Sequence, residues 1–229
     1  MCVCQTPENQ LFYGEYTSNP DRRAVLILGS FDKGRRWESV YSFSDVRHIH
    51  GVFYDRYTDT IWATTGDTDE ESIIWQFDRR FNKPRKVLKG SQQTRAVQLL
   101  FSKDSVFFGS DSPLERNFLY RLSRSSGKVT PVQEVGGSIF YGCKVKDGLV
   151  FSTAVEPSDI NTRQSSEVWY SETGDDWTLI SSYPKDIWPV RFFQYGQVLF
   201  PSGENNTSEL WYTPFSTEMD GRSLHRKLP

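Results

Sequence analysis

The stretch SFDKGRRW, residues 30–37, has the pattern Ser-x-Asp-x-Gly-x-x-Trp, which suits a tight turn between two β-strands. The Asp32 carboxylate can accept hydrogen bonds from nearby backbone N–H groups, and Gly34 can adopt a positive φ without steric cost. The apolar segment AVLIL precedes this turn, and WESVYSF follows it from Trp37 onward. Both segments favour strands. The pattern therefore predicts a β-hairpin in which the Trp37 ring is buried between neighbouring sheets.

A similar unit recurs along the whole chain. Short strands that end in apolar or aromatic residues, such as IIW, FLY, VWY and LWY, follow one another at intervals of about 40–50 residues, the length of a four-stranded propeller blade. An earlier strand in each unit runs into small residues and then an acidic residue. These acidic residues are Glu15, Asp67, Asp111, Glu156 and Glu204.

The repeat predicts an all-β fold, a β-propeller with about five four-stranded blades in a single domain over residues 1–229. No window has the apolar spacing of an amphipathic helix. The first unit lacks the innermost strand that we expect in the others, at 190–195 in the fifth unit. Either the C-terminus completes the first blade, or the chain is a truncated six-bladed propeller. The blade units are expected at about 10–46, 47–93, 94–136, 137–187 and 188–229.

Composition excludes some classes of function. The net charge is −2 and no basic stripe is present, so nucleic acid is not expected as a main partner. The longest apolar runs are a handful of residues, so we expect a soluble chain with no membrane span, and no signal peptide is visible. Localisation and oligomeric state are not predicted. The three cysteines, Cys2, Cys4 and Cys143, are expected to be free thiols.

A second turn, SETGDDW at residues 171–177, keeps part of the first pattern through Ser171, Gly174 and Trp177. The complete match consists of Ser30, Asp32, Gly34 and Trp37. Together with the repeat, these turns resemble the Asp-boxes of sialidase-like, BNR-repeat β-propellers. The resemblance implies a structural role for the turns, on the outer side of the blades and away from any ligand. It also implies a fold shared by glycan hydrolases, glycan-binding proteins and scaffolds, so it does not decide the activity.

A typical sialidase is not expected. Sialidases carry an arginine triad, an Arg-Ile-Pro segment and a tyrosine nucleophile paired with a glutamate. The sequence has no Arg-Ile-Pro segment and no such Tyr–Glu pair that can be placed. If the chain is an enzyme, the resemblance favours a different activity of the glycoside hydrolase type.

Two sets of polar residues are expected at one end of the blades, where propeller ligands usually bind. The acidic set follows the second strand of each unit, and a basic set precedes the innermost strands. In an antiparallel sheet these two positions share an edge, so both sets are expected to surround one channel mouth. The ligand-binding candidates are Arg47, His48, Arg95, Glu15, Glu156, Arg191 and Glu204.

Each of these residues also has a plain interpretation. Acidic residues after glycine often begin polar turns, and arginines neutralise them. His48 and His50, two residues apart on a strand, point to the same side, a spacing used for metals. No third ligand is close in sequence, although Asp67 or Asp111 could approach in space. We therefore assign no metal and no cofactor.

The functional prediction is carbohydrate binding at the channel mouth, and it leaves open whether the sugar is also processed. If catalysis occurs, Asp67 and Asp111 with His50 are the candidates, because two carboxylates can flank a glycosidic bond. The alternative is a non-catalytic propeller scaffold for protein–protein interaction. The expected partner is thus a carbohydrate or another protein.

Overall fold

The computed structural model describes residues 3–203 and 205–228. Over these residues the chain is built from β-strands and loops, and η1 (Gln92–Thr94) is a short 3-10 helix. The expected all-β class is confirmed. The chain divides into two compact units, residues 1–97 and 98–229.

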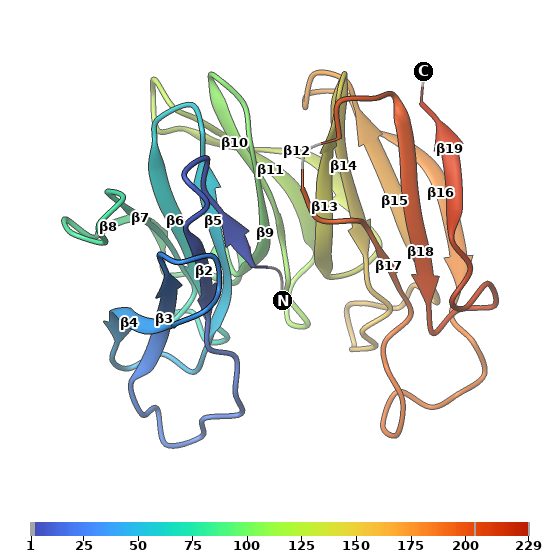
Figure 1. The fold of residues 1–229 in the computed structure, drawn as a ribbon. Helices are drawn as coiled ribbons and strands as arrows, with labels where there is room; N and C mark the ends of the chain where they lie inside the picture. The colour runs from blue at the N-terminus through green and yellow to red at the C-terminus, as the bar shows by residue number, and fades with distance from the viewer. Residues whose placement is uncertain (1–2, 204, 229) are drawn as a thin grey trace. The chain divides into compact units, whose positions relative to one another are not determined.

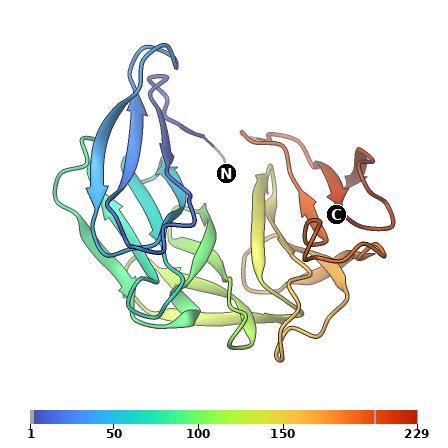
Figure 2. The same ribbon diagram turned by 90° about the horizontal axis from the view of Figure 1, so that it is seen from below.

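The first unit consists of two four-stranded antiparallel sheets in which neighbours in sequence are neighbours in space (Figure 1). Figure 2 shows strands of the first sheet, in blue, lying side by side. The first sheet contains β1 (Cys4–Gln5), β2 (Leu11–Gly14), β3 (Val25–Ser30) and β4 (Glu38–Phe43), and the second contains β5 (Ile49–Asp55), β6 (Thr60–Thr65), β7 (Ile73–Phe77) and β8 (Arg85–Lys89).

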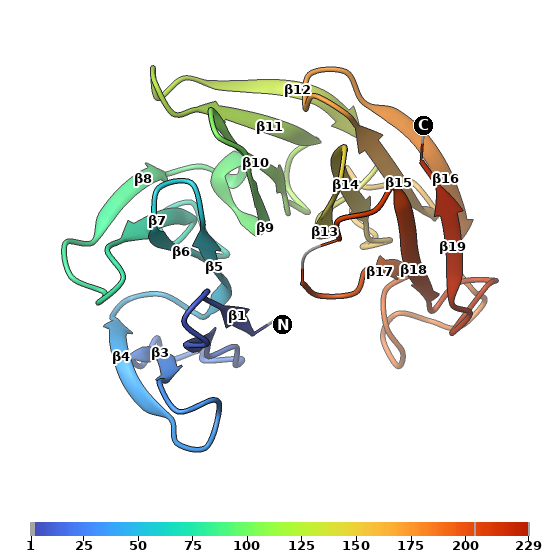
Figure 3. The ribbon, with the colours of Figure 1, turned by 45° about the horizontal axis from the view of Figure 1, so that its top comes forward.

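The second unit repeats this meander three times. Figure 3 shows the strands following one another in order across their sheets. The third sheet begins with β9 (Ala96–Phe101), which starts at the end of the first unit. Its other strands are β10 (Ser105–Ser110), β11 (Asn117–Ser123) and β12 (Val129–Val135). The last two sheets contain β13 (Ile139–Val145), β14 (Gly148–Thr153), β15 (Ser165–Ser171) and β16 (Thr178–Pro184), then β17 (Gln197–Leu199), β18 (Glu209–Phe215) and β19 (Leu224–Lys227).

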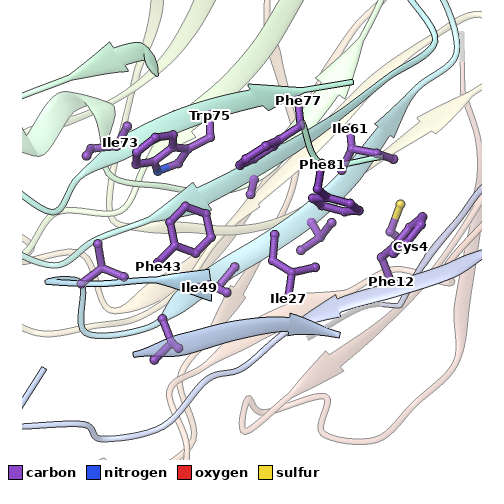
Figure 4. Close-up of a cluster of buried hydrophobic side chains, with 14 residues drawn as sticks. Cys4, Phe12, Ile27, Phe43, Ile49, Ile61, Ile73, Trp75, Phe77 and Phe81 are labelled. Atoms are coloured by element: carbon purple, nitrogen blue, oxygen red, sulfur yellow. The ribbon is translucent and has the colours of Figure 1, made fainter. Parts of the chain in front are cut away.

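Aromatic and branched side chains from both sheets of the first unit form one apolar core (Figure 4). Phe12, Ile27, Ile49 and Ile61 in this core are fully buried. Phe12 packs edge to face on Phe81, with ring centroids 5.1 Å apart. Burial of each such side chain stabilises the fold by about 1.5–3 kcal/mol. An isolated hairpin cannot bury side chains in this way and is at most marginally stable in water. Each sheet is therefore held by packing on its neighbour.

Two glycines allow neighbouring sheets to approach closely. A Cβ atom on Gly14, at the end of β2, would lie 2.3 Å from Ile49 Cγ2 at the start of β5. In the second unit, a Cβ on Gly109 would lie 2.2 Å from Ile139 Cδ1 in the same way. These two equivalent contacts show that the repeat extends to the packing between sheets.

The turn at residues 30–37 has the hydrogen bonds that its sequence predicts. Asp32 Oδ1 accepts a bond from Arg36 N at 2.9 Å, and Ser30 Oγ accepts one from Gly34 N at 2.8 Å. Gly34 has a φ of 86°. The turn at 171–177 is similar, since Gly174 N donates to Ser171 Oγ at 2.7 Å. In both turns, therefore, the glycine N–H donates a hydrogen bond to the hydroxyl group of the first serine.

The position of Trp37 differs from the prediction. Its ring is 38% exposed rather than buried between sheets. It packs edge to face on Tyr13, with centroids 5.1 Å apart, and its Nε1 donates to Gly34 O at 3.2 Å. The hydrogen bond from the indole N–H to the Gly34 carbonyl holds the side chain over the turn and over one face of its own sheet.

The incomplete sheet is the fifth rather than the first. A two-residue strand, β1, pairs with β2 and gives the first sheet its innermost strand. Residues 190–195, expected as a strand, form turns and irregular backbone. Among the described residues the fifth sheet has three strands. The short β1 segment, CQ, carries too little apolar pattern to be recognised as a strand.

Cys4 and Cys143 are free thiols, as expected, while Cys2 lies outside the described residues. Burial raises the pKa of each of these two thiols to about 12, so both are protonated at neutral pH. Within the described part of the chain, no helix is long and apolar enough to cross a membrane.

Candidate functional site

Five of the predicted polar side chains meet at one edge of the second sheet, within the first unit. Strand β5 pairs antiparallel with β6, and Ile49 lies opposite Thr65. The start of β5 and the end of β6 are therefore at the same edge, as predicted for the acidic and basic sets. The side chains brought together here are those of Arg47, His48, His50, Asp67 and Arg95.

A β-bulge directs the two histidines toward each other. The register between β5 and β6 shifts between Ile49 and Gly51, so His50 is the extra residue. Bulges of this kind redirect side chains and recur beside functional sites. His48 Nε2 and His50 Nε2 lie 2.9 Å apart.

The Asp67 carboxylate lies at the centre of the cluster. Its Oδ1 is 3.3 Å from both His48 Nε2 and His50 Nε2. Its Oδ2 accepts a hydrogen bond from Arg47 Nη1 at 2.7 Å, and Arg95 Nη2 lies 3.3 Å from Oδ1. Gln92 Nε2 donates to the backbone carbonyl of Asp67 at 2.9 Å, which fixes the loop that carries the carboxylate.

Each histidine ring is also held by a hydrogen bond at Nδ1, on the side of the ring away from Nε2. His48 Nδ1 lies 3.2 Å from Thr17 O, and His50 Nδ1 lies 3.2 Å from Ala96 O. A carbonyl oxygen can only accept a hydrogen bond, so each Nδ1 is the donor. The Tyr16 ring stacks on His48 with a centroid distance of 4.0 Å. Neither imidazole is therefore free to turn.

The two histidines of the cluster are buried, whereas Tyr16 and Arg47 reach solvent. His48 and His50 are each 4% exposed, whereas Tyr16 is 56% exposed. The Arg47 side chain is 40% exposed and that of Asp67 is 15% exposed. Arg47 and Tyr16 can therefore contact a ligand from solvent, with Asp67 behind them.

Burial and charge set the protonation of this cluster. Burial lowers the pKa of His50, and the charges of His48 and Arg95 act in the same direction. Burial by itself would raise the pKa of Asp67, but the positive charge of Arg95, whose Nη2 lies 3.3 Å from Oδ1, helps to hold it well below its ordinary value. At neutral pH, Asp67 is therefore a carboxylate and His50 is a neutral imidazole.

Other predicted site residues have contacts of their own. The Glu15 carboxylate accepts a hydrogen bond from Leu26 N at 2.8 Å and so serves the β2–β3 pairing. Asp111, Glu156 and Arg191 belong to the second unit. Asp111 is 3% exposed, Glu156 accepts a bond from Ser138 Oγ at 2.6 Å, and Arg191 lies over the Phe192 ring. Glu204 lies outside the described residues.

Sequence reasoning missed Tyr16 and Gln92. Tyr16 directly follows the predicted Glu15, and no sequence signal distinguishes its role from that of any loop tyrosine. It also missed an exposed apolar loop in the second unit, where the side chains of Ile187 and Phe192 are 90% and 74% exposed. Because residues 190–195 were expected to form a strand, their exposure was not predicted.

Comparison with known proteins defines the fold. No protein-family model matches the sequence, and no curated protein matches it. A chain of a nidogen/laminin complex is similar in structure with a TM-score of 0.62 and 9% identity, over 93% of this chain and 70% of that one. A chain of a mitotic checkpoint complex gives 0.60 and 9%, over 95% and 60%. TolB from Acinetobacter baumannii gives 0.57 and 12%, over 99% and 56%. At these identities the likeness shows a propeller-type fold.

Proposed function

We propose that this chain is a sialidase-like propeller whose first unit binds a carbohydrate at the cluster around Asp67. One observation carries the proposal: exposed Arg47 and Tyr16 lie beside a half-buried carboxylate that is flanked by two buried histidines. Sugar recognition uses such a combination, in which charged groups bond to hydroxyls and an aromatic face covers the ring. The turns at 30–37 and 171–177 are then structural Asp-boxes.

The exposed guanidinium group of Arg47 favours an acidic sugar. Two guanidinium groups, those of Arg47 and Arg95, contact the single carboxylate of Asp67. Arg47 Nε donates to Ser18 O at 3.0 Å and its Nη1 donates to Asp67, so a ligand carboxylate or sulfate would be contacted by the remaining, exposed side of this guanidinium group.

Binding is better supported than hydrolysis. A glycosidase needs a carboxylic acid that gives up its proton to the leaving group. Asp67 is held ionised by its neighbours and is unsuited to that role. Asp67 therefore anchors Arg47 and Arg95, and a general acid would have to come from another residue.

A glycan array that contains neutral, uronic and sulfated sugars tests the proposal. The full chain should retain an acidic glycan, and Arg47→Ala should reduce binding at least tenfold. Arg116→Ala is a matched control, because Arg116 is also exposed and pairs with Glu134 at 3.2 Å. Absence of glycan binding, or equal loss in both variants, would overturn the proposal.

Protein recognition by the loop at residues 187–193 is a second candidate function. Trp188 and Phe193, with ring centroids 5.2 Å apart, are more than half exposed, as are Ile187 and Phe192. Soluble chains rarely expose so many large apolar groups together unless they bind a partner. Sedimentation velocity of the wild type and Phe192→Ser tests one such partner, a second copy of the chain. Concentration-dependent association that Phe192→Ser abolishes would support it, and a monomer at all concentrations would exclude self-association.

A further inference from the structure

Three donor atoms of the cluster face one another with the spacing of metal ligands. His48 Nε2, His50 Nε2 and Asp67 Oδ1 form a triangle with sides of 2.9, 3.3 and 3.3 Å. Ligands bound to zinc at about 2.0–2.1 Å lie about 3.3 Å apart in a tetrahedron and about 2.9 Å apart in an octahedron. The triangle therefore has the size of one face of a coordination sphere.

The hydrogen bonds on the far side of each ring aim both lone pairs at this triangle. Each Nδ1–H donates to a backbone carbonyl, Thr17 O for His48 and Ala96 O for His50. A neutral imidazole with its proton on Nδ1 carries a lone pair on Nε2. Metal-binding histidines have this arrangement, in which the outer N–H is fixed by a carbonyl or carboxylate.

These three atoms repel one another unless a positive charge lies among them. Two Nε2 lone pairs and a carboxylate oxygen are all hydrogen-bond acceptors. A proton on one Nε2 is the simplest charge that relieves the repulsion, but it would place an imidazolium in a buried site beside Arg95. A metal ion would bond to all three atoms at once, and binding of the ion would displace that proton.

We propose that His48, His50 and Asp67 bind one divalent transition-metal ion. Two imidazole nitrogens and one carboxylate oxygen suit Zn²⁺, Fe²⁺ or Mn²⁺ rather than Ca²⁺, which prefers an all-oxygen shell. From the sequence we assigned no metal, because no third ligand lies close to the two histidines along the chain. The β5–β6 pairing supplies that ligand from Asp67, seventeen residues after His50.

The proposed site leaves coordination positions that the protein does not fill. Three protein ligands do not complete a tetrahedral or octahedral shell, so water or a ligand atom takes the remaining positions. Arg47 lies on the exposed side of the same carboxylate. An anionic oxygen would therefore find both a metal ion and a guanidinium there. Metal binding does not depend on the proposed carbohydrate function, and it is measured without any sugar.

Zinc titration of the full chain tests this inference. The chain has three histidines, so a long-range ¹H–¹⁵N spectrum resolves every imidazole. After removal of metals with a chelator, Zn²⁺ should shift the Nε2 signals of His48 and His50 and saturate at one equivalent. The His225 signal should not move, because that residue lies on β19 in the second unit. This measurement needs no variant, and it separates the site from cysteine thiols.

Variants extend the test. Asp67→Asn and His50→Ala should each weaken Zn²⁺ binding at least a hundredfold by calorimetry, with folding checked by circular dichroism. His225→Ala is the matched control and should bind as the wild type does. Substitution of Co²⁺ gives visible absorption bands that report the coordination number. No imidazole shift, a stoichiometry far below one, or binding that only His225→Ala removes would overturn the proposal.

Discussion

His48 Nε2 and His50 Nε2 lie 2.9 Å apart, although each ring already donates its Nδ1 proton to a backbone carbonyl. Two acceptor nitrogens thus face each other inside a buried cluster. The bulge at His50 creates this contact, because an ordinary alternation would leave the rings parallel along one face of the strand. The two rings and Asp67 therefore form a preorganised set of donor atoms.

Replacement of Asp67 by Asn should destabilise the first unit in a pH-dependent manner. The pKa of Asp67 is lowered in the folded chain, so its contribution to stability is present above the ordinary aspartate pKa and is lost as the pH falls. The free energy of unfolding should fall by about 1–3 kcal/mol at pH 7. Below about pH 4 the difference between variant and wild type should shrink. Urea unfolding at several pH values measures this, and a difference that grows toward acid pH would contradict it.

Replacement of Gly14 by Ala should disturb the site from a distance. The new Cβ would clash with Ile49, which lies between the two histidines. We expect a loss of about 1–3 kcal/mol in the free energy of unfolding and weaker Zn²⁺ binding. Gly109→Ala is the matched control, since it creates the same clash with Ile139 in the second unit. Equal Zn²⁺ affinities in the two variants would show that Ile49 does not position the histidines.

Removal of Ser30 Oγ should weaken the first turn. Ser30 is fully buried, and its Oγ accepts from Gly34 N and donates to Asp32 Oδ1. Ser30→Ala should cost about 1–3 kcal/mol, because the Gly34 N–H loses its partner. Ser171→Ala should have a similar effect through Gly174. Thermal melts that leave both variants as stable as the wild type would argue against a structural role for these turns.

Replacement of Trp37 by Ala should cost less than the loss of a fully buried tryptophan. The ring is 38% exposed and covers Tyr13. Because more than a third of Trp37 is exposed, we expect a decrease of about 1–2 kcal/mol in the free energy of unfolding, below the 3–5 kcal/mol typical of a buried ring. Denaturant unfolding measures the loss, and a decrease above about 3 kcal/mol would mean that the ring is buried in solution.

Neutralisation of Arg95 should strengthen metal binding. Arg95 Nη2 lies 3.3 Å from Asp67 Oδ1, the oxygen that we assign to the metal. Without that charge, Oδ1 is available and a dication meets less repulsion. Arg95→Gln should raise Zn²⁺ affinity about tenfold, which corresponds to about 1.4 kcal/mol. An affinity that falls or stays constant in calorimetry would place the metal away from Oδ1.

Much of the fold could be predicted from sequence because strand patterns and turn residues are local. The pairing of β5 with β6 follows from the same patterns, and it was enough to bring Arg47 and His50 to the edge that carries Asp67. The bulge at His50 and the stacking of Tyr16 on His48 depend on packing between elements and left no signal in the sequence. The exposed loop around Phe192 was missed for a related reason, since apolar residues predict burial whether or not a neighbouring strand is present.

Anomalous diffraction at the zinc absorption edge, from a crystal of the full chain grown with Zn²⁺, would locate the metal ion. We expect one strong peak about 2.0–2.2 Å from His48 Nε2, His50 Nε2 and Asp67 Oδ1. A map with no peak among these three atoms, or with its strongest peak at His225 or at a cysteine, would contradict the claim that this cluster binds a metal ion.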